Sequence, residues 1–201
     1  MSALSVAVLT SSCKKEPSCA KMGYEFVYTD YGVRYYVDND SIPLGNSVTI
    51  EAAVPKTFFD NYTNTNVTLT ENTISGPLSV FKATNDPMIP RLDATFSVSV
   101  SSDIGNCVID SLPWGTYRKY YKTTFASFPD SFKLKINVTP NEKGIYFLGL
   151  AQQGNRDREC AVFRYFIKVK DTNQHLYFLE ENNGGVLLPE DRDYAYCFKV
   201  Y

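Results

Sequence analysis

The stretch SFKLKINV, residues 131–138, sets the fold class of this chain. Phe132, Leu134, Ile136 and Val138 alternate with serine, lysine and asparagine, so every second side chain is apolar. Successive side chains of a β-strand point to opposite faces, so this spacing places the apolar residues on one face and the polar residues on the other. The stretch therefore predicts a strand with one face in a core and one face in water.

Two more stretches carry the same alternation. They are SVTIEAAV, residues 47–54, and DATFSVSV, residues 93–100. The apolar positions share one parity within each stretch and are Val48, Ile50, Ala52 and Val54, then Ala94, Phe96, Val98 and Val100. In GIYFLGL, residues 144–150, apolar side chains occupy both parities, which predicts a strand that is covered on both sides.

Shorter β-rich runs, separated by turn residues, complete the expected fold. They begin at Tyr24, Val33, Asn66, Leu78, Cys160 and His175, and one more, YCFKVY, ends the chain. Turn chemistry marks residues 43–46, 76–77, 140–144, 171–173 and 182–185. About ten short strands with turns between them predict an all-β fold, an antiparallel, Ig-like β-sandwich. No repeat or linker divides the chain, so we expect one sandwich over residues 24–201 rather than two Ig-like domains.

One segment does not follow the strand pattern. In LPWGTYRKYYKTTFASF, residues 112–128, aromatic residues recur at steps of three and four, which is the spacing of one helix face. These residues are Trp114, Tyr117, Tyr121, Phe125 and Phe128. We expect a short helix or an irregular crossover near residues 114–128, although tyrosine, threonine and phenylalanine locally favour strands.

The chain begins with MSALSVAVLTSSCKKEP, in which an apolar run is followed by small residues, a cysteine and a charged spacer. The run is shorter than the roughly 20 apolar residues of a membrane span, and it suits the apolar region of a secretory signal. The letters SSCKKE, residues 11–16, resemble the lipoprotein signals of Bacteroidetes. We therefore expect a signal segment at residues 1–12, lipidation of Cys13 and a tether at residues 13–23. The alternative is that residues 1–12 form a buried strand and Cys13 is a plain thiol.

Signal and sandwich together resemble the uncharacterised β-sandwich lipoproteins of the Bacteroidetes cell envelope. The resemblance implies a protein outside the cytoplasm that is held to a membrane by the lipid on Cys13. We expect this membrane to be the outer membrane. It leaves open which side of that membrane the protein faces, and it implies no activity.

Composition and motifs exclude several classes of function. The chain has 20 Lys and Arg against 22 Asp and Glu, spread without blocks, so no basic patch points to nucleic acid. It contains no Gly-x-Ser-x-Gly, no His-Glu-x-x-His and no phosphate loop, so we assign no catalytic residue and expect no cofactor. His175, the single histidine, lies in an apolar run and is interpreted as structural.

Besides Cys13 the chain has four cysteines, Cys19, Cys107, Cys160 and Cys197. An even number in an exported protein permits two disulfides, and the sequence does not choose among the three connectivities. Cys160 opens one expected strand and Cys197 lies in the last, which favours that pair. Zinc binding is the rival interpretation, but without a Cys-x-x-Cys pair we expect no metal site.

Trp114, Tyr117, Tyr120 and Tyr121 are the candidate ligand-binding residues. Their flat rings could stack on the apolar faces of sugar rings, and their hydroxyl groups could add polar contacts. The alternative is that the aromatic stripe packs onto the sandwich, as the apolar stripe of a covering helix does.

Two short motifs are candidate modification sites. Residues 40–42 (DSI) and 110–112 (DSL) resemble the acceptor motif for O-glycosylation in exported Bacteroidetes proteins, which makes Ser41 and Ser111 candidate acceptors.

The sequence leads to a non-catalytic, membrane-anchored envelope lipoprotein that binds a glycan or a protein partner. A hydrolase of glycans or peptidoglycan is the first alternative, because paired carboxylates can converge from separate strands. A structural assembly subunit that exposes a strand edge or an apolar patch is the second.

Overall fold

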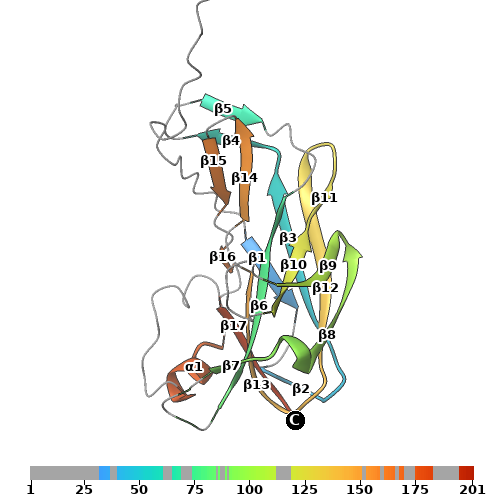
Figure 1. The fold of residues 1–201 in the computed structure, drawn as a ribbon, viewed down its shortest axis with the longest axis vertical. Coiled ribbons are helices and arrows are strands. Elements are labelled where there is room, and N and C mark those ends of the chain that lie inside the picture. The colour runs from blue at the N-terminus through green and yellow to red at the C-terminus, as the bar shows by residue number, and fades with distance from the viewer. Residues whose placement is uncertain are drawn as a thin grey trace, which may run out of the picture.

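The computed structural model describes residues 32–36, 40–60, 65–68, 74–84, 86, 89, 91–111, 119–150, 153–158, 161–165, 168–169, 175–182 and 195–201. Two β-sheets pack against each other, so the expected all-β sandwich is confirmed (Figure 1). The expected signal segment and tether, with Cys13 and Cys19, lie outside the described residues.

The first sheet has the strand order β11-β12-β3-β1-β16, and β8 also pairs with β12. Its strands are β1 (Gly32–Tyr36), β3 (Val48–Pro55), β8 (Val98–Ile104), β11 (Ala126–Ser127), β12 (Ser131–Pro140) and β16 (Lys168–Val169). All of its pairs are antiparallel except β1 with β16.

The second sheet has the order β2-β17-β13-β6-β10-β9, and β7 also pairs with β6. Its strands are β2 (Ser41–Ile42), β6 (Ser75–Ala83), β7 (Arg91–Asp93), β9 (Asn106–Ser111), β10 (Lys119–Thr124), β13 (Gly144–Leu150) and β17 (Ala195–Val200). The remaining elements are β4 (Thr57–Asp60), β5 (Thr65–Thr68), β14 (Gln153–Arg158), β15 (Ala161–Tyr165), the 3-10 turn η2 (Thr95–Ser97) and the helix α1 (Tyr177–Asn182). The β4–β5 hairpin lies far from the C-terminus, whereas β2 and β7 lie near it (Figure 1).

The alternating residues of β3 and β12 build the centre of the sandwich. Val54 lies opposite Phe132 in the antiparallel register of these strands, and both side chains are fully buried. On the outer face, Glu51 and Lys135 form an ion pair of 2.9 Å between the carboxylate and the ammonium group. The two strands predicted from alternation at residues 47–54 and 131–138 are therefore confirmed.

Strand β13 is covered on both sides, as its two-parity pattern predicted. Tyr146, Leu148 and Leu150 belong to the sandwich core between the sheets. Phe147 points to the other face and belongs to a second apolar cluster outside the sandwich. Buried neighbours on both faces explain why this strand carries no polar alternation.

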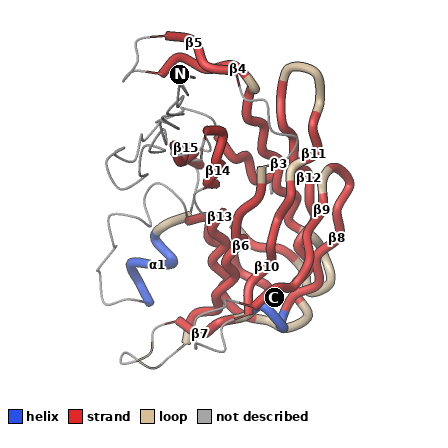
Figure 2. Tube along the Cα trace, turned by 45° about the horizontal axis from the view of Figure 1, so that its top comes forward, coloured by secondary structure: helices blue, strands red, loops and turns tan. Residues whose placement is uncertain are grey.

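The run at residues 175–179, predicted as a strand, instead leads into helix α1. His175 adopts a left-handed backbone conformation with φ of +52°. Phe178 then packs with Phe147 and Cys197 in the second apolar cluster, and Figure 2 shows α1 beside β13 and away from β3 and β12. The prediction was wrong because a short apolar run fits a strand or a helix equally well.

The helix expected near residues 114–128 is wrong where the structure describes the segment, because β10 and β11 occupy it. Tyr121 lies in β10, opposite Ile109 of β9 and Leu78 of β6. Residues four apart have the same parity, so aromatic side chains at that spacing share one face of a strand as readily as one face of a helix. Residues 112–118 lie outside the described residues.

Residues 93–100, predicted as one strand, belong to two different sheets. β7 ends at Asp93 in the sheet of β6, and β8 begins at Val98 in the sheet of β12. The turn η2 carries the chain between the sheets and leaves Phe96 70% exposed. The prediction was wrong because alternation does not say which sheet a residue joins, and a chain that changes sheets bends at the corner.

One predicted turn is confirmed and another is wrong. The Asn46 N–H donates to the Pro43 carbonyl at 3.1 Å, which closes the turn between β2 and β3. Gly76 and Pro77, expected as a turn, lie within β6. Pairing of β6 with β13 begins only at Leu78, so the missing N–H of Pro77 interrupts no hydrogen bond to β13.

Candidate functional site

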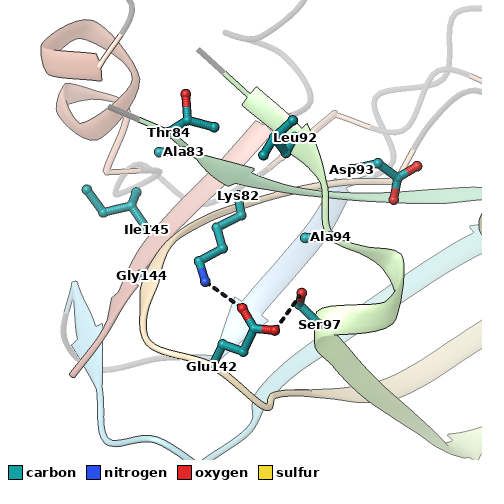
Figure 3. A pocket seen from close by; sticks show the side chains of 10 residues that line it. All are labelled: Lys82, Ala83, Thr84, Leu92, Asp93, Ala94, Ser97, Glu142, Gly144 and Ile145. Atoms are coloured by element: carbon teal, nitrogen blue, oxygen red, sulfur yellow. Dashed lines mark hydrogen bonds and ion pairs between the residues drawn. The ribbon is translucent and has the colours of Figure 1, made fainter. Parts of the chain in front are cut away.

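A pocket of about 570 Å³ opens at the end of the sandwich, where β6, β7, η2 and the turn into β13 meet (Figure 3). Two of its polar side chains contact one carboxylate. The Lys82 ammonium lies 2.8 Å from Glu142 Oε2, and the Ser97 hydroxyl donates to Glu142 Oε1 at 3.4 Å. The hydrogen bond and the charge of Lys82 lower the pKa of Glu142, so this carboxyl group is ionised at neutral pH.

The packing around Lys82 holds this pair in place. The Lys82 ammonium lies 5.7 Å from the centroid of the Tyr146 ring, a cation–π distance. Gly144 has a φ of +149°, and a Cβ atom there would lie 2.5 Å from Lys82 Cε. Glycine at position 144 therefore leaves room for the lysine stem to cross the strand.

A smaller pocket of about 170 Å³ lies between β6, β7, η2 and the start of β10. Phe81 and Tyr120 supply aromatic rings to its lining, while Asp93 and Lys119 supply charged groups. Burial and, to a smaller extent, the neighbouring Asp110 carboxylate raise the pKa of Tyr120. Asp93 also lines the larger pocket, so the two pockets adjoin at the end of β7.

Three large apolar side chains are exposed next to these pockets. Ile89 is 51%, Leu92 54% and Phe96 70% exposed, and we call these three residues the β7 patch. The Thr84 hydroxyl donates to the Ile89 carbonyl, and the Asp86 N–H donates to the Thr84 hydroxyl at 3.1 Å. These bonds hold Asp86 and the backbone of Ile89 to Thr84, the residue that follows β6.

The four aromatic residues predicted to bind a ligand do not form one platform. Tyr121 is 5% exposed, and its hydroxyl donates to the Val98 carbonyl at 3.0 Å inside the sandwich. Its neighbour Tyr120 points to the opposite face and lines the smaller pocket. Trp114 and Tyr117 lie outside the described residues, so their part of the prediction stays open. Strand alternation, unlike a helix, separates adjacent tyrosines by placing them on opposite faces.

Cys197 is fully buried in the second apolar cluster. Its predicted disulfide partner, Cys160, lies outside the described residues, so the pairing stays a prediction. Cys107 is half-buried in β9 and forms no disulfide with any residue that the structure describes. Burial raises the pKa of the Cys107 thiol to about 12, so this group is protonated and unreactive at neutral pH.

His175 joins α1 to the second sheet. Its Nδ1–H donates to the Cys197 carbonyl at 2.9 Å, and the side chain is 5% exposed. Two residues later the Tyr177 hydroxyl donates to Asp40, an interaction that lowers the pKa of Asp40 and helps burial to raise the pKa of Tyr177 to about 12. These contacts fit the structural role that the sequence indicated for His175.

The two candidate acceptor serines lie on edge strands of the second sheet. Ser41 begins β2 and is partly exposed, and Ser111 ends β9. Within the described ranges, no three His, Cys, Asp or Glu side chains are grouped closely enough to hold a metal ion. No helix in that part of the chain is long and apolar enough to cross a bilayer.

The pocket residues Lys82, Asp93 and Glu142 were not predicted from the sequence. Lys82 lies in β6, Asp93 in β7 and Glu142 in the turn between β12 and β13, and the Lys82–Glu142 pair is 60 residues apart, so no local motif marks it. Phe96 was predicted to be buried with Val98 and Val100. Its place in the alternating pattern was the only sequence signal for Phe96, and that pattern predicted burial, whereas the side chain is exposed.

Comparisons with protein-family models, with curated proteins and with solved structures found no match to this chain. Its function is therefore inferred from its own residues.

Proposed function

We propose that this chain is a lipid-anchored protein of the cell envelope that binds a protein partner through the β7 patch and catalyses no reaction. The anchor rests on the signal-like sequence ending at Cys13. The three exposed apolar side chains of the β7 patch carry the binding part of the proposal, because exposed apolar side chains that gather on one part of a surface mark an interaction site, and Phe96, at 70%, is the most exposed of them.

The patch has the composition of the centre of a protein interface. Ile89, Leu92 and Phe96 lie within eight residues of one another in the sequence, and Leu92 lines the larger pocket together with the Lys82–Glu142 pair. Interfaces place apolar and aromatic side chains at their centre and polar side chains at their rim. The hydrogen bond from Thr84 holds the backbone of Ile89 before binding, which reduces the entropy that this residue loses when a partner docks.

The hydrolase alternative is less well supported by the larger pocket. A glycosidase needs one carboxylic acid whose pKa is raised, so that it can protonate the leaving group. Of the two carboxylates that line this pocket, Glu142 is paired with Lys82, and its pKa is lowered instead. Glu142 is therefore suited to hold Lys82 and not to donate a proton.

The direct test is to recover the full chain from envelope membranes under gentle solubilisation, with a photoreactive amino acid at position 92. We expect a cross-linked protein partner with the wild-type patch and loss of that partner with Phe96→Ala. Phe59→Ala is the matched control, because Phe59 is also exposed, at 50%, but lies on β4 at a different part of the molecule. Recovery of the chain alone, or equal loss in both variants, would contradict the proposal.

The anchor is tested separately by Cys13→Ser. We expect this variant to leave the membrane fraction, and mass spectrometry of the wild type to find a lipid on Cys13. An intact, unmodified N-terminus would contradict this part of the proposal without bearing on the patch.

A further inference from the structure

We infer that the smaller pocket, between β6, η2 and β10, is a binding site for one neutral sugar ring in the pyranose form. This site is separate from the β7 patch and does not depend on the protein partner. The inference rests on the groups that line the pocket, on which of them have no other partner, and on how rigidly they are held.

The aromatic part of the site comes from Phe81 of β6 and Tyr120 of β10. A pyranose has C–H groups on its faces, and these pack against the negative face of an aromatic ring. Tyr120 is partly exposed and lies opposite Asp110 in the antiparallel register of β10 and β9. The ring is carried by a paired strand, so its backbone is in place before a sugar arrives, which lowers the entropy cost of binding.

The polar part of the site is the Asp93 carboxylate, one oxygen of which accepts no hydrogen bond from the described residues. Asp93 Oδ1 accepts the Thr95 N–H at 2.9 Å, which fixes the side chain. Among the residues that the structure describes, Asp93 Oδ2 has no hydrogen-bond partner. A carboxylate accepts hydrogen bonds from hydroxyl groups strongly, so this oxygen is suited to one or two sugar hydroxyls.

Two further groups complement the carboxylate. Ser79 contributes a hydroxyl that can donate or accept, and Lys119 contributes an ammonium group that can only donate. Neither side chain has a partner among the described residues. Thr95 is buried, and its hydroxyl donates to the Lys119 carbonyl at 3.2 Å. This bond ties the start of β10 to η2.

The size and charge of the pocket limit which ligands could bind there. Its volume of about 170 Å³ is below the roughly 300 Å³ at which pockets for drug-sized ligands begin, so it holds one ring and not an extended chain. Asp93 and Lys119 have opposite charges, so the site has no net charge to attract an acidic or a basic sugar. A neutral hexose, free or at the end of a glycan, is the ligand with the matching chemistry.

The inference is tested by saturation-transfer NMR and titration of the full chain with methyl glucoside, methyl galactoside and methyl mannoside, beside glucuronic acid and glucosamine. We expect at least one neutral glycoside to bind with a dissociation constant in the millimolar range, which is typical of a single ring in a shallow site. Tyr120→Ala should weaken this binding about tenfold or more, and Asp93→Asn should weaken it while keeping the acceptor for Thr95.

Tyr201→Ala is the matched control, because Tyr201 is another exposed tyrosine, at 57%, at the C-terminus. It should leave sugar binding unchanged, and thermal unfolding of all three variants should verify that they fold. Absence of binding to every neutral glycoside, or binding that Tyr120→Ala and Asp93→Asn leave unchanged, would overturn the inference. Stronger binding of glucuronic acid or glucosamine would overturn the assignment to a neutral sugar.

Discussion

Residues 131–138 and residues 93–100 carry almost the same alternation of apolar and polar side chains, and they fold differently. In the first stretch, β12 pairs with β3 over all of residues 131–138 and with β8 from Lys135 onward. In the second stretch, β7 pairs with β6 in one sheet and β8 pairs with β12 in the other. The two stretches therefore differ in the strands that lie beside them and not in their pattern.

The hydrogen bonds around η2 locate the point where the second stretch changes sheets. The Ala94 N–H still donates to Val80 of β6 at 2.9 Å, whereas the Ser97 carbonyl accepts from Asn141, next to the end of β12, at 2.8 Å. Between these two bonds the chain must turn, and the phenylalanine at the corner faces outward. Alternation thus predicts burial only where a strand keeps the same neighbours along its length.

The largest effect is expected when the regular stretch loses a phenylalanine. Phe132→Ala should lower the free energy of unfolding by about 3–5 kcal/mol, because Phe132 is fully buried opposite Val54 and its removal leaves a cavity. Denaturant unfolding followed by tyrosine fluorescence measures the change. A loss below about 1 kcal/mol would mean that β12 is not the centre of the core.

A second change of sheets occurs at Gly105, and its substitution should have the next largest effect. β8 pairs with β12 up to Ile104, and β9 pairs with β10 from Asn106. Gly105 has a φ of +81°, and a Cβ atom there would lie 2.5 Å from the Thr124 carbonyl oxygen and 2.9 Å from Leu134 Cδ1. Gly105→Ala should therefore cost about 2 kcal/mol or more, from backbone strain and from these contacts.

Gly45→Ala is the matched control for this effect. Gly45 has a similar φ of +88°, but a Cβ atom there would meet nothing within 4 Å. Its substitution should cost only the backbone strain of about 1–2 kcal/mol. Equal losses in the two variants, measured by denaturant unfolding, would show that close packing at the second corner contributes nothing.

The regular parts of the fold could be predicted from the sequence because their signal is local. Alternation in β3 and β12 indicates that one face of each strand is buried. Apolar residues at both parities in β13 indicate that both of its faces are buried. The corner at η2 could not be predicted, because it depends on pairing with β6 and β12, which are distant in sequence. The same limit explains α1, where the apolar cluster on β13 and β17 selects a helix for a run that also suits a strand.

Only one residue of the two pockets was predicted from the sequence, because it belongs to a recognisable aromatic run. Tyr120 was predicted as a ligand-binding residue, and it lines the smaller pocket. Tyr121 was predicted with it but is buried, because the segment is a strand and not a helix. Lys82 and Asp93 lie in β6 and β7, and Glu142 lies in the turn before β13. Only the antiparallel pairing of β6 with β7 and with β13 brings these three charged residues to one end of the sandwich.

A smaller effect is expected from the ion pair beside the corner. The pKa of Glu142 is lowered by Lys82, so this pair stabilises the fold above the ordinary pKa of 4.5, and the stabilisation is lost as pH falls through the lowered value. Glu142→Gln should lower the melting temperature at pH 7 by no more than a few degrees, because the pair is solvent-exposed. The difference from the wild type should shrink towards zero at pH 3.

Melting curves of wild type and Glu142→Gln between pH 7 and pH 3 provide the measurement. Asp40 and Asp130, whose pKa values are also lowered, are present in both proteins and so do not affect the comparison. A difference that stays constant across this range would assign the effect to packing and not to charge.

The smallest effect on stability is expected from the phenylalanine at the corner. Phe96 has the same place in its alternating stretch as an inward-facing residue of β12, yet it is 70% exposed. Phe96→Ala should therefore change the free energy of unfolding by no more than about 0.5 kcal/mol, whereas the same substitution at Phe132 costs several times more. Denaturant unfolding of the two variants side by side measures this contrast. A loss above about 1 kcal/mol at Phe96 would mean that its ring is packed within the folded chain. The ring would then be unable to serve a partner, and the proposed interface would lose its central residue.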